Sequence, residues 1–228
     1  PAMAALDPVL MTGLPPAVTA ATGMDALTHA VEAFVGHWAT AHTDRLALAA
    51  VGIVYERLRV AYRKPKDLEA REQMSLAATY AGLAFTRANV GYVHAIAHQL
   101  GGKYHTPHGL ANAIMLPHVL RFLSPAITRR LALLAVRAGV GKPGEQAATL
   151  AKKFIDSVEK LNRDVGIPAQ VDALREEDIP ELAKAACWEA DTNYPVPRYM
   201  SPATCAKILR QVLPSTAAPK PARRRSAR

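Results

Sequence analysis

Cysteine is scarce in this sequence, and its spacing excludes two common kinds of small scaffold. The 228 residues include only Cys187 and Cys205, which lie 18 positions apart without a CxxC pattern. Disulfide frameworks and closed thiolate zinc sites both need more cysteines at closer spacing. We therefore expect the protein to occupy a reducing compartment, with the cytoplasm as the default location.

Long apolar runs and an initiator methionine are also missing, and aromatic residues are few. No apolar run reaches the roughly 18 residues of a membrane span, and no basic-then-apolar signal opens the chain, so we predict no membrane partner. Aromatic residues make up only 6% of the sequence, whereas Ala and Leu are abundant, which predicts an all-α fold. Because the sequence does not begin with Met, we expect it to be part of a longer protein.

The formal net charge of +9 is unevenly distributed. The last fifteen residues, PSTAAPKPARRRSAR, carry five positive charges and no negative one, which leaves +4 for the rest of the chain. A segment of this composition cannot bury apolar surface, so residues 214–228 are predicted to be a disordered basic tail. Because a basic tail alone is weak evidence for nucleic-acid binding, we predict no nucleic-acid partner.

The rest of the chain is predicted to form one helical domain over residues 17–213, preceded by an extended lead-in over residues 1–16. The lead-in is apolar and rich in Pro, without a helical period. Apolar residues then recur at helical spacing from Ala17 to Phe34, and Thr22 with Asp25 resembles an N-cap pair at which the main helix begins. Further helices are expected at about 43–62, 67–88, 92–101, 109–123, 125–138, 144–164, 178–190 and 202–213.

Two short segments concentrate residues that bind metals. Asp25 and His29 are four positions apart in a helical pattern, which places both side chains on one helix face. His94 and His98 repeat that spacing, and His108 follows between a Pro and a Gly. Imidazole and carboxylate ligands suit divalent iron, zinc, cobalt or manganese.

Each of these residues also has an ordinary structural interpretation. Asp25 would stabilise a helix N-terminus beside Thr22, and His108 after a Pro would be a turn or cap residue. A lone His29, His94 or His98 on an apolar face is more often a hydrogen-bonded core histidine than a ligand. The joint pattern is harder to explain in this way, because several buried imidazoles must all find polar partners. A zinc-peptidase mechanism lacks its base, since Ala95 follows His94 where HExxH would place Glu.

The segments ATGMDALTHAVEAF and GYVHAIAHQLGGKYHTPHGLANAIMLPHVLRF closely resemble the two signature segments of iron-containing, or group III, alcohol dehydrogenases. The resemblance extends more loosely from LDPVLMTGLPP to about Leu213. It implies the all-helical domain of the dehydroquinate synthase-like, iron-containing alcohol dehydrogenase fold, without the N-terminal α/β nucleotide-binding domain of that family. That domain would bind most of the NAD or NADP.

The family resemblance also implies roles for the candidate residues. The metal ligands would be Asp25, His29, His94 and His108, with Fe2+ as the metal and Zn2+ or another divalent ion as alternatives. His98 would lie near the nicotinamide and the substrate, as a catalytic and cofactor-binding residue that relays a proton or positions the substrate. A metal held in this way would act as a Lewis acid on the alcohol oxygen while hydride departs to the nicotinamide.

The resulting hypothesis is a metal-dependent alcohol dehydrogenase fragment that interconverts a small alcohol and its aldehyde or ketone with NAD(P). Two alternatives remain open at this stage. Asp and His ligands also activate water in metal-dependent hydrolases and lyases, and a helical domain without its nucleotide-binding partner could be a non-catalytic metal-binding remnant. The family resemblance allows a homo-oligomer, but no local feature of the sequence establishes one.

Overall fold

The computed structural model describes residues 3–214, and within this range the protein consists of helices without a β-strand. This confirms the predicted all-α fold class. None of the described helices is both long enough and apolar enough to cross a membrane. The predicted basic tail, apart from Pro214, lies outside the described residues.

A helix is present at each position expected from the sequence. In chain order the elements are η1 (Pro8–Met11), α1 (Pro16–Val35), α2 (Ala41–Arg63), α3 (Leu68–Ala88), α4 (Tyr92–Tyr104), α5 (His108–Arg137), α6 (Ala147–Asp164), η2 (Glu176–Asp178), α7 (Ile179–Asn193) and α8 (Pro202–Arg210).

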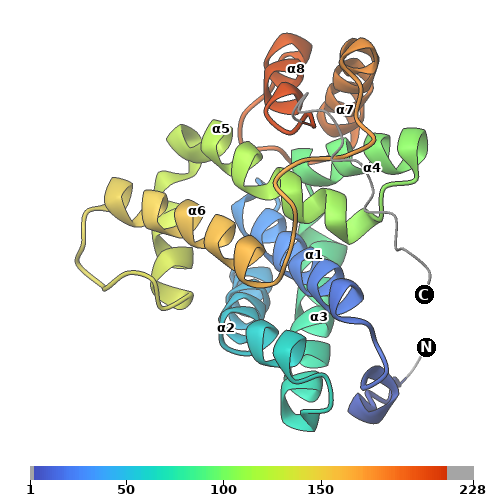
Figure 1. Ribbon diagram of the computed structural model, residues 1–228. Helices are drawn as coiled ribbons and strands as arrows, with labels where there is room; N and C mark the ends of the chain where they lie inside the picture. The colour runs from blue at the N-terminus through green and yellow to red at the C-terminus, as the bar shows by residue number, and fades with distance from the viewer. Residues whose placement is uncertain (1–2, 215–228) are drawn as a thin grey trace, which may run out of the picture.

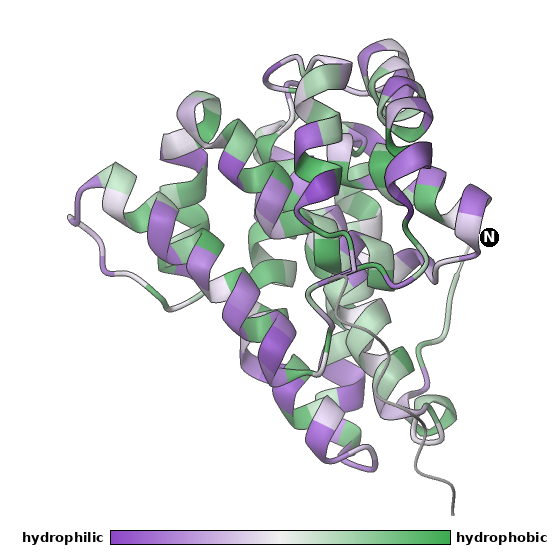
Figure 2. Ribbon diagram, turned by 45° about the horizontal axis from the view of Figure 1, so that its top comes forward, coloured by the Kyte–Doolittle hydropathy of each residue, from purple (hydrophilic) through white to green (hydrophobic). Residues whose placement is uncertain are grey.

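Helix α1 lies at the centre of the fold, packed against α2, α3 and α5 (Figure 1). Its apolar side chains are buried on more than one face, with Met24 and Val31 on one side and Ala26 and Ala33 on the opposite side. Figure 2 shows the general pattern, with hydrophobic residues between the helices and hydrophilic residues toward the outside. A helix enclosed on several sides is well suited to hold functional side chains rigidly, because its neighbours restrict its movement.

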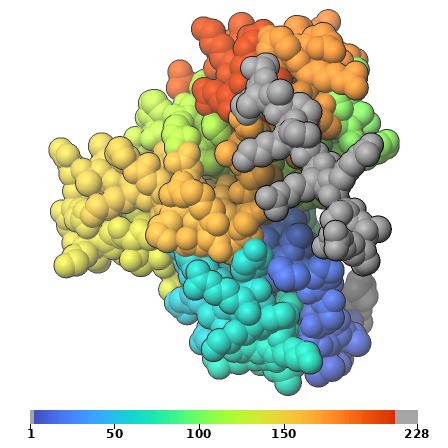
Figure 3. All heavy atoms as spheres, in the orientation of Figure 1, coloured from blue at the N-terminus to red at the C-terminus, as the bar shows by residue number. Residues whose placement is uncertain are grey.

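The second half of the chain adds α4, which packs against α5 and α7, while α7 packs against α8. In Figure 1, α7 and α8 form a pair at the top, and α6 extends to the left along α5. The connection from α6 to α7 runs over the face shown in Figure 3, from the end of α6 up to the α7–α8 pair. The N-terminal ends of α4 and α5 lie close together beside the middle of α1.

The predicted N-cap of the main helix is wrong. Helix α1 begins at Pro16, not at Thr22, because a Pro with its fixed φ is well accommodated in the first turn of a helix. Thr22 lies inside the helix, where its hydroxyl donates a hydrogen bond of 2.8 Å to the Val18 carbonyl one turn earlier. Asp25 is therefore not a first-turn residue, and its carboxylate needs another explanation.

The two helices predicted at about 109–123 and 125–138 lie within α5 and meet at a kink, a few residues after the predicted break near residue 124. Helix α5 runs through Pro117 and Pro125 and is kinked at Ile127, where φ is −122° and ψ is 19°. A Pro removes one helical hydrogen bond and clashes with the carbonyl four residues earlier, which bends a helix that is otherwise held by packing. The packing of α5 against α1, α4 and α6 supplies that support.

Several helix ends differ by a few residues from expectation. Helix α4 continues through Gly101 and ends at Tyr104. The next residue, His105, caps the helix: its backbone is left-handed (φ 55°) and its N–H donates to the Gly101 carbonyl. Helix α6 begins at Ala147, after Gly144 with a φ of 90° and the non-helical Gln146 (ψ 132°), and α8 ends at Arg210. A left-handed residue closes a helix by satisfying one of its last free carbonyls.

The lead-in segment is not extended throughout. Pro8–Met11 form the 3-10 helix η1, because the Asp7 carboxylate accepts a hydrogen bond of 2.9 Å from the Val9 N–H and Pro8 fits the first helical position. This short helix contacts α3.

Candidate metal centre

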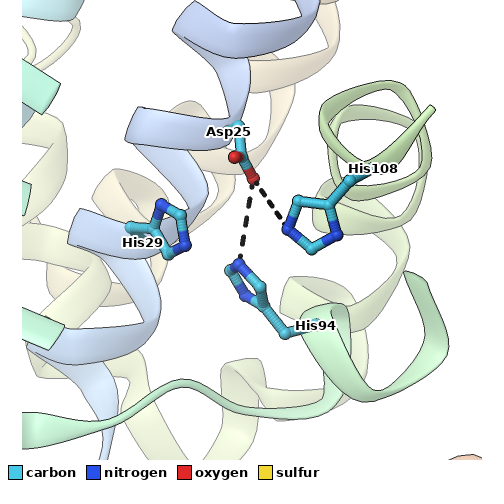
Figure 4. A group of neighbouring side chains, drawn as sticks. All are labelled: Asp25, His29, His94 and His108. Carbon is cyan, nitrogen blue, oxygen red and sulfur yellow. Dashed lines mark ion pairs between the residues drawn. The ribbon is translucent and has the colours of Figure 1, made fainter. Parts of the chain in front are cut away.

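Four side chains predicted as metal ligands converge on one point of the fold. Asp25 and His29 come from adjacent turns of α1, His94 from the first turn of α4, and His108 is the first residue of α5. One ligand atom from each of the four lies within 4.8 Å of all the others. Figure 4 shows the carboxylate and the three rings directed toward a common centre.

The separations within this cluster are too long for direct hydrogen bonds. The Asp25 Oδ1 atom lies 3.5 Å from His108 Nε2 and 3.8 Å from His94 Nε2. The His29 ring stacks on the His94 ring with a centroid distance of 4.5 Å. Hydrogen bonds between such groups are shorter than about 3.2 Å. The four side chains therefore surround a space without forming hydrogen bonds to one another across it.

His94 gives the clearest sign that a metal fits this space. Its Nε2 atom is buried and has no hydrogen-bond partner among the described residues. A buried nitrogen without a partner is costly, by about 1–3 kcal/mol. Three imidazoles and one carboxylate around this atom form a ligand set that suits a divalent iron, zinc or related ion.

Glu32 fixes the orientation of His94 from the opposite side of the ring. Its side chain is buried on α1 and its Oε2 atom lies 2.6 Å from His94 Nδ1. A carboxylate only accepts hydrogen bonds, so the imidazole proton lies on Nδ1 and Nε2 is left as a free electron-pair donor. This carboxylate–histidine arrangement is the usual support for a metal-binding histidine.

Glu32 was not predicted as a site residue from the sequence. The available signal was its position three residues after His29, which places both residues on one side of α1. What the sequence could not show is that Glu32 is buried and faces the first turn of α4. There it also accepts hydrogen bonds from the Gly91 and Val93 N–H groups at 2.9 and 2.8 Å.

Gly109 allows His108 to reach the cluster. A Cβ atom at this position would lie 2.4 Å from the backbone oxygen of Ala21 and 3.2 Å from the Cβ of Asp25. Because the nearest atom belongs to the backbone of α1, a larger residue could not be accommodated by a side-chain movement. The start of α5 can therefore approach α1 closely only with Gly at position 109.

Asn112 lies one turn further along α5 and contacts two candidate ligands. Its amide Nδ2 donates to Asp25 Oδ1 at 2.6 Å and lies 3.0 Å from His108 Nε2. Asn112 therefore restrains the Asp25 carboxylate toward the cluster.

His98 lies at the edge of the cluster and is not one of its four members. Its ring stacks against the His108 ring at a centroid distance of 5.4 Å and lies edge-on to His94 at 6.1 Å. Its Nδ1 atom is 2.6 Å from Glu189 Oε1 on α7. Its side chain is 42% exposed, so a bound molecule beside the cluster could reach it.

Other residues of the signature segments lie outside the cluster. The Thr28 hydroxyl donates to the Met24 carbonyl within α1, and Gln99 donates to Glu189. His118 pairs with Gln211 near α8. These contacts give each residue a structural role.

Burial keeps two of the histidines in the form that binds metals. Desolvation by burial, followed by the nearby His94, lowers the pKa of His29 to about 4. Burial also lowers the pKa of His108. Both rings are therefore neutral near pH 7, and a metal need not displace a proton from either.

A cavity of about 720 Å³ adjoins the cluster. Asp25 and His108 lie on its wall, and the remaining wall is formed mainly by apolar residues of α1, α5 and the segment after α6. A cavity of this size admits a small organic molecule.

The fold and the cluster together define an all-helical protein with a group of three histidines and one carboxylate that could hold a metal ion. The chain belongs to the iron-containing alcohol dehydrogenase family, since residues 19–213 match the model of its C-terminal region, described as "Fe-containing alcohol dehydrogenase family, C-terminal". This confirms the resemblance inferred from the two signature segments.

Individual relatives agree with this membership. The chain is 43% identical to 1,3-propanediol dehydrogenase of Klebsiella pneumoniae over 213 residues, which cover 92% of this chain and 55% of the relative. It is also 43% identical to lactaldehyde reductase of Escherichia coli K12, covering 85% of this chain and 50% of that protein. The chain therefore spans about half the length of these curated relatives.

Solved structures show the same fold. The crystal structure of a 1,3-propanediol oxidoreductase superposes with a TM-score of 0.87 at 42% identity, covering 91% of this chain and 55% of that one. The alcohol dehydrogenase from Oenococcus oeni superposes with a TM-score of 0.85 at 36% identity, covering 90% and 54%.

The lowered pKa of His29 predicts how the metal-free protein responds to acid. Since the unfolded chain takes up this proton near pH 6.5 and the folded protein only near pH 4, the free energy of unfolding should fall as the pH drops through that window. The loss attributable to His29 is on the order of 3 kcal/mol. Urea unfolding in the presence of a chelator, with His29→Asn as the comparison, measures it.

The difference between the two proteins isolates His29 from the other titrating groups. We expect the wild-type advantage over His29→Asn to shrink between pH 6.5 and 4. A difference that stays constant, or grows in acid, would show that His29 is not held neutral by the fold.

Proposed function

We propose that this chain forms the metal-binding helical part of an NAD(P)-dependent alcohol dehydrogenase, which interconverts a small alcohol and its aldehyde or ketone. The observation that carries the proposal is the convergence of Asp25, His29, His94 and His108 around the unpartnered Nε2 of His94. The names of the relatives, 1,3-propanediol dehydrogenase and lactaldehyde reductase, support a small alcohol or aldehyde as the substrate.

We propose Fe2+ as the metal, in keeping with the family name, with Zn2+ as the alternative that the same ligands would accept. When bound, the metal would supply Lewis-acid stabilisation of the negative charge that develops on the alcohol oxygen. Asp25 and the three histidines would hold it, while Glu32 keeps His94 in the correct tautomer and Asn112 restrains Asp25.

The residues around the cluster suggest how the chain would treat a substrate. The ring of His98 is positioned beside His108 and is accessible, so it can accept the hydroxyl proton of the alcohol or orient the nicotinamide. The mainly apolar cavity beside Asp25 and His108 can exclude water from part of the site. The hydride itself would pass to NAD(P). NAD(P) would bind mainly to a region that corresponds to the part of the relatives that this chain does not cover, which is about half of their length.

We also propose a cytoplasmic location. The two cysteines are buried and unpaired, which agrees with a reducing compartment.

Removing single ligands tests the proposed function. After anaerobic loading with Fe2+, the protein should retain close to one metal ion per chain, and His94→Ala and His108→Ala should lose most of it. His42→Ala is the matched control, since His42 is exposed at the start of α2 and should leave the metal content unchanged. Elemental analysis of folded, gel-filtered protein gives the stoichiometry.

The same samples address the reaction. Combined with the separately produced N-terminal half of a relative, the metal-loaded wild type and His42→Ala should reduce NAD(P) when an alcohol is present, and the two ligand variants should not. Full metal content in His94→Ala would contradict the proposed site. Metal-dependent ester hydrolysis without nucleotide would favour a hydrolase instead.

Glu32 should matter for affinity without being a ligand. Glu32→Gln keeps the size of the side chain but weakens the bond that fixes His94, so we expect about 10–100-fold weaker metal binding. Glu181→Gln, on the exposed face of α7, is the control. Competition with a chromophoric chelator measures both affinities, and equal affinity in the two variants would show that Glu32 does not support the centre.

A further inference from the structure

Glu189 is the meeting point of three hydrogen bonds beside the candidate metal centre. Its Oε1 atom lies 2.6 Å from His98 Nδ1 and accepts a second bond of 2.6 Å from the Tyr194 hydroxyl. Its Oε2 atom accepts a bond of 2.7 Å from the Gln99 amide. Both carboxylate oxygens are thus engaged, although Glu189 is not a member of the ligand cluster.

These bonds connect parts of the chain that are far apart in sequence. His98 and Gln99 are neighbours on α4, whereas Glu189 lies on α7 about ninety residues later. The two helices pack against each other, and the Glu189 side chain is only 18% exposed. A carboxylate held by three donors in a packed interface has a fixed position, which it imposes on the groups that it binds.

Tyr194 strengthens this arrangement as a permanent donor. Burial raises the pKa of the Tyr194 hydroxyl, and the adjacent Glu189 carboxylate raises it further. The hydroxyl therefore keeps its proton and donates to Glu189 throughout the neutral range.

The bond to Glu189 determines which nitrogen of His98 carries the proton. Because a carboxylate is acceptor-only, a neutral His98 must place its proton on Nδ1, which leaves Nε2 bare. Neutral imidazole in water carries its proton more often on Nε2, so the fold would reverse the ordinary preference. With Nδ1 tied to α7, Nε2 is the ring nitrogen free to meet a molecule bound beside His94 and His108.

We propose that Glu189 is a positioning residue, which fixes the ring of His98 and holds it in the Nδ1–H tautomer so that Nε2 accepts a hydrogen bond from a hydroxyl or amide of the bound substrate or cofactor. The use of that nitrogen in a reaction rests on the proposed function, whereas the tautomer itself does not. Glu189 would thereby do for His98 what Glu32 does for His94.

The tautomer can be read directly in the metal-free and the Zn2+-loaded chain. Long-range 1H–15N correlation spectra distinguish the two neutral forms of a histidine, and His98→Gln assigns the signals. We expect Nδ1–H in the wild type. In Glu189→Leu, which has no acceptor, the ratio of Nδ1–H to Nε2–H should fall by about tenfold, the effect of losing one hydrogen bond to a charged group.

Two further variants separate positioning from damage to the fold. Glu189→Gln retains one acceptor oxygen and should keep the Nδ1–H form, because Gln99 can turn its amide to bond with the new side chain. Glu181→Leu, on the same helix but paired with Lys103 away from His98, should leave the tautomer unchanged. The Nε2–H form in the wild type, or an unchanged ratio in a folded Glu189→Leu, would overturn the proposal.

Zn2+ titration of the same samples distinguishes this inference from the proposed function. If the wild type binds no Zn2+ but its His98 tautomer depends on Glu189, the positioning role stands and the metal centre fails. If Zn2+ binds stoichiometrically and the tautomer is indifferent to Glu189, the positioning role fails and the metal centre stands.

Discussion

The bond between the buried Glu32 carboxylate and His94 joins the two helices that supply three of the four candidate ligands. Glu32 belongs to α1, and it accepts hydrogen bonds from the Gly91 and Val93 N–H groups as well as from His94. It therefore acts as the cap of α4, which has no capping side chain of its own. The carboxylate that satisfies the free N–H groups at the start of α4 thus also orients His94 in the first turn of that helix.

This arrangement demands small residues where the helices meet. A Cβ atom on Gly91 would lie 2.9 Å from Glu32 Oε1, and one on Gly109 would lie 2.4 Å from the α1 backbone. The two glycines thus let α4 and α5 begin against α1, with His94 and His108 facing Asp25. Asp25 and Glu32 contribute two negative charges beside neutral imidazoles, which matches the charge of a divalent cation.

Much of the fold and the cluster could be predicted, because the helices and the ligand pairs follow from short-range spacing in the sequence and from the two signature segments. The i,i+4 spacing of Asp25 and His29 placed them on one face of a helix, and the family resemblance joined them to the segments of His94 and His108, which the structure brings together. The helix boundaries were less predictable: α1 begins at Pro16 and not at Thr22, and the kink in α5 lies at Ile127 and not near residue 124.

The supporting carboxylates could not be predicted for a different reason. Glu32 and Glu189 act on residues 62 and 91 positions away, and their burial depends on how α1, α4 and α7 pack. In the sequence both resemble ordinary charged residues of a helix surface. Only the three-dimensional structure shows that each accepts several hydrogen bonds and orients one histidine.

The central claim is that three histidines and one aspartate hold a single divalent ion. X-ray absorption at the zinc edge of the Zn2+-loaded chain tests it most directly, because imidazole rings produce a distinctive multiple-scattering pattern. We expect three imidazole nitrogens and at least one carboxylate oxygen at about 2.0–2.2 Å from the zinc. Fewer than three imidazoles, or a sulfur ligand from Cys187 or Cys205, would contradict it.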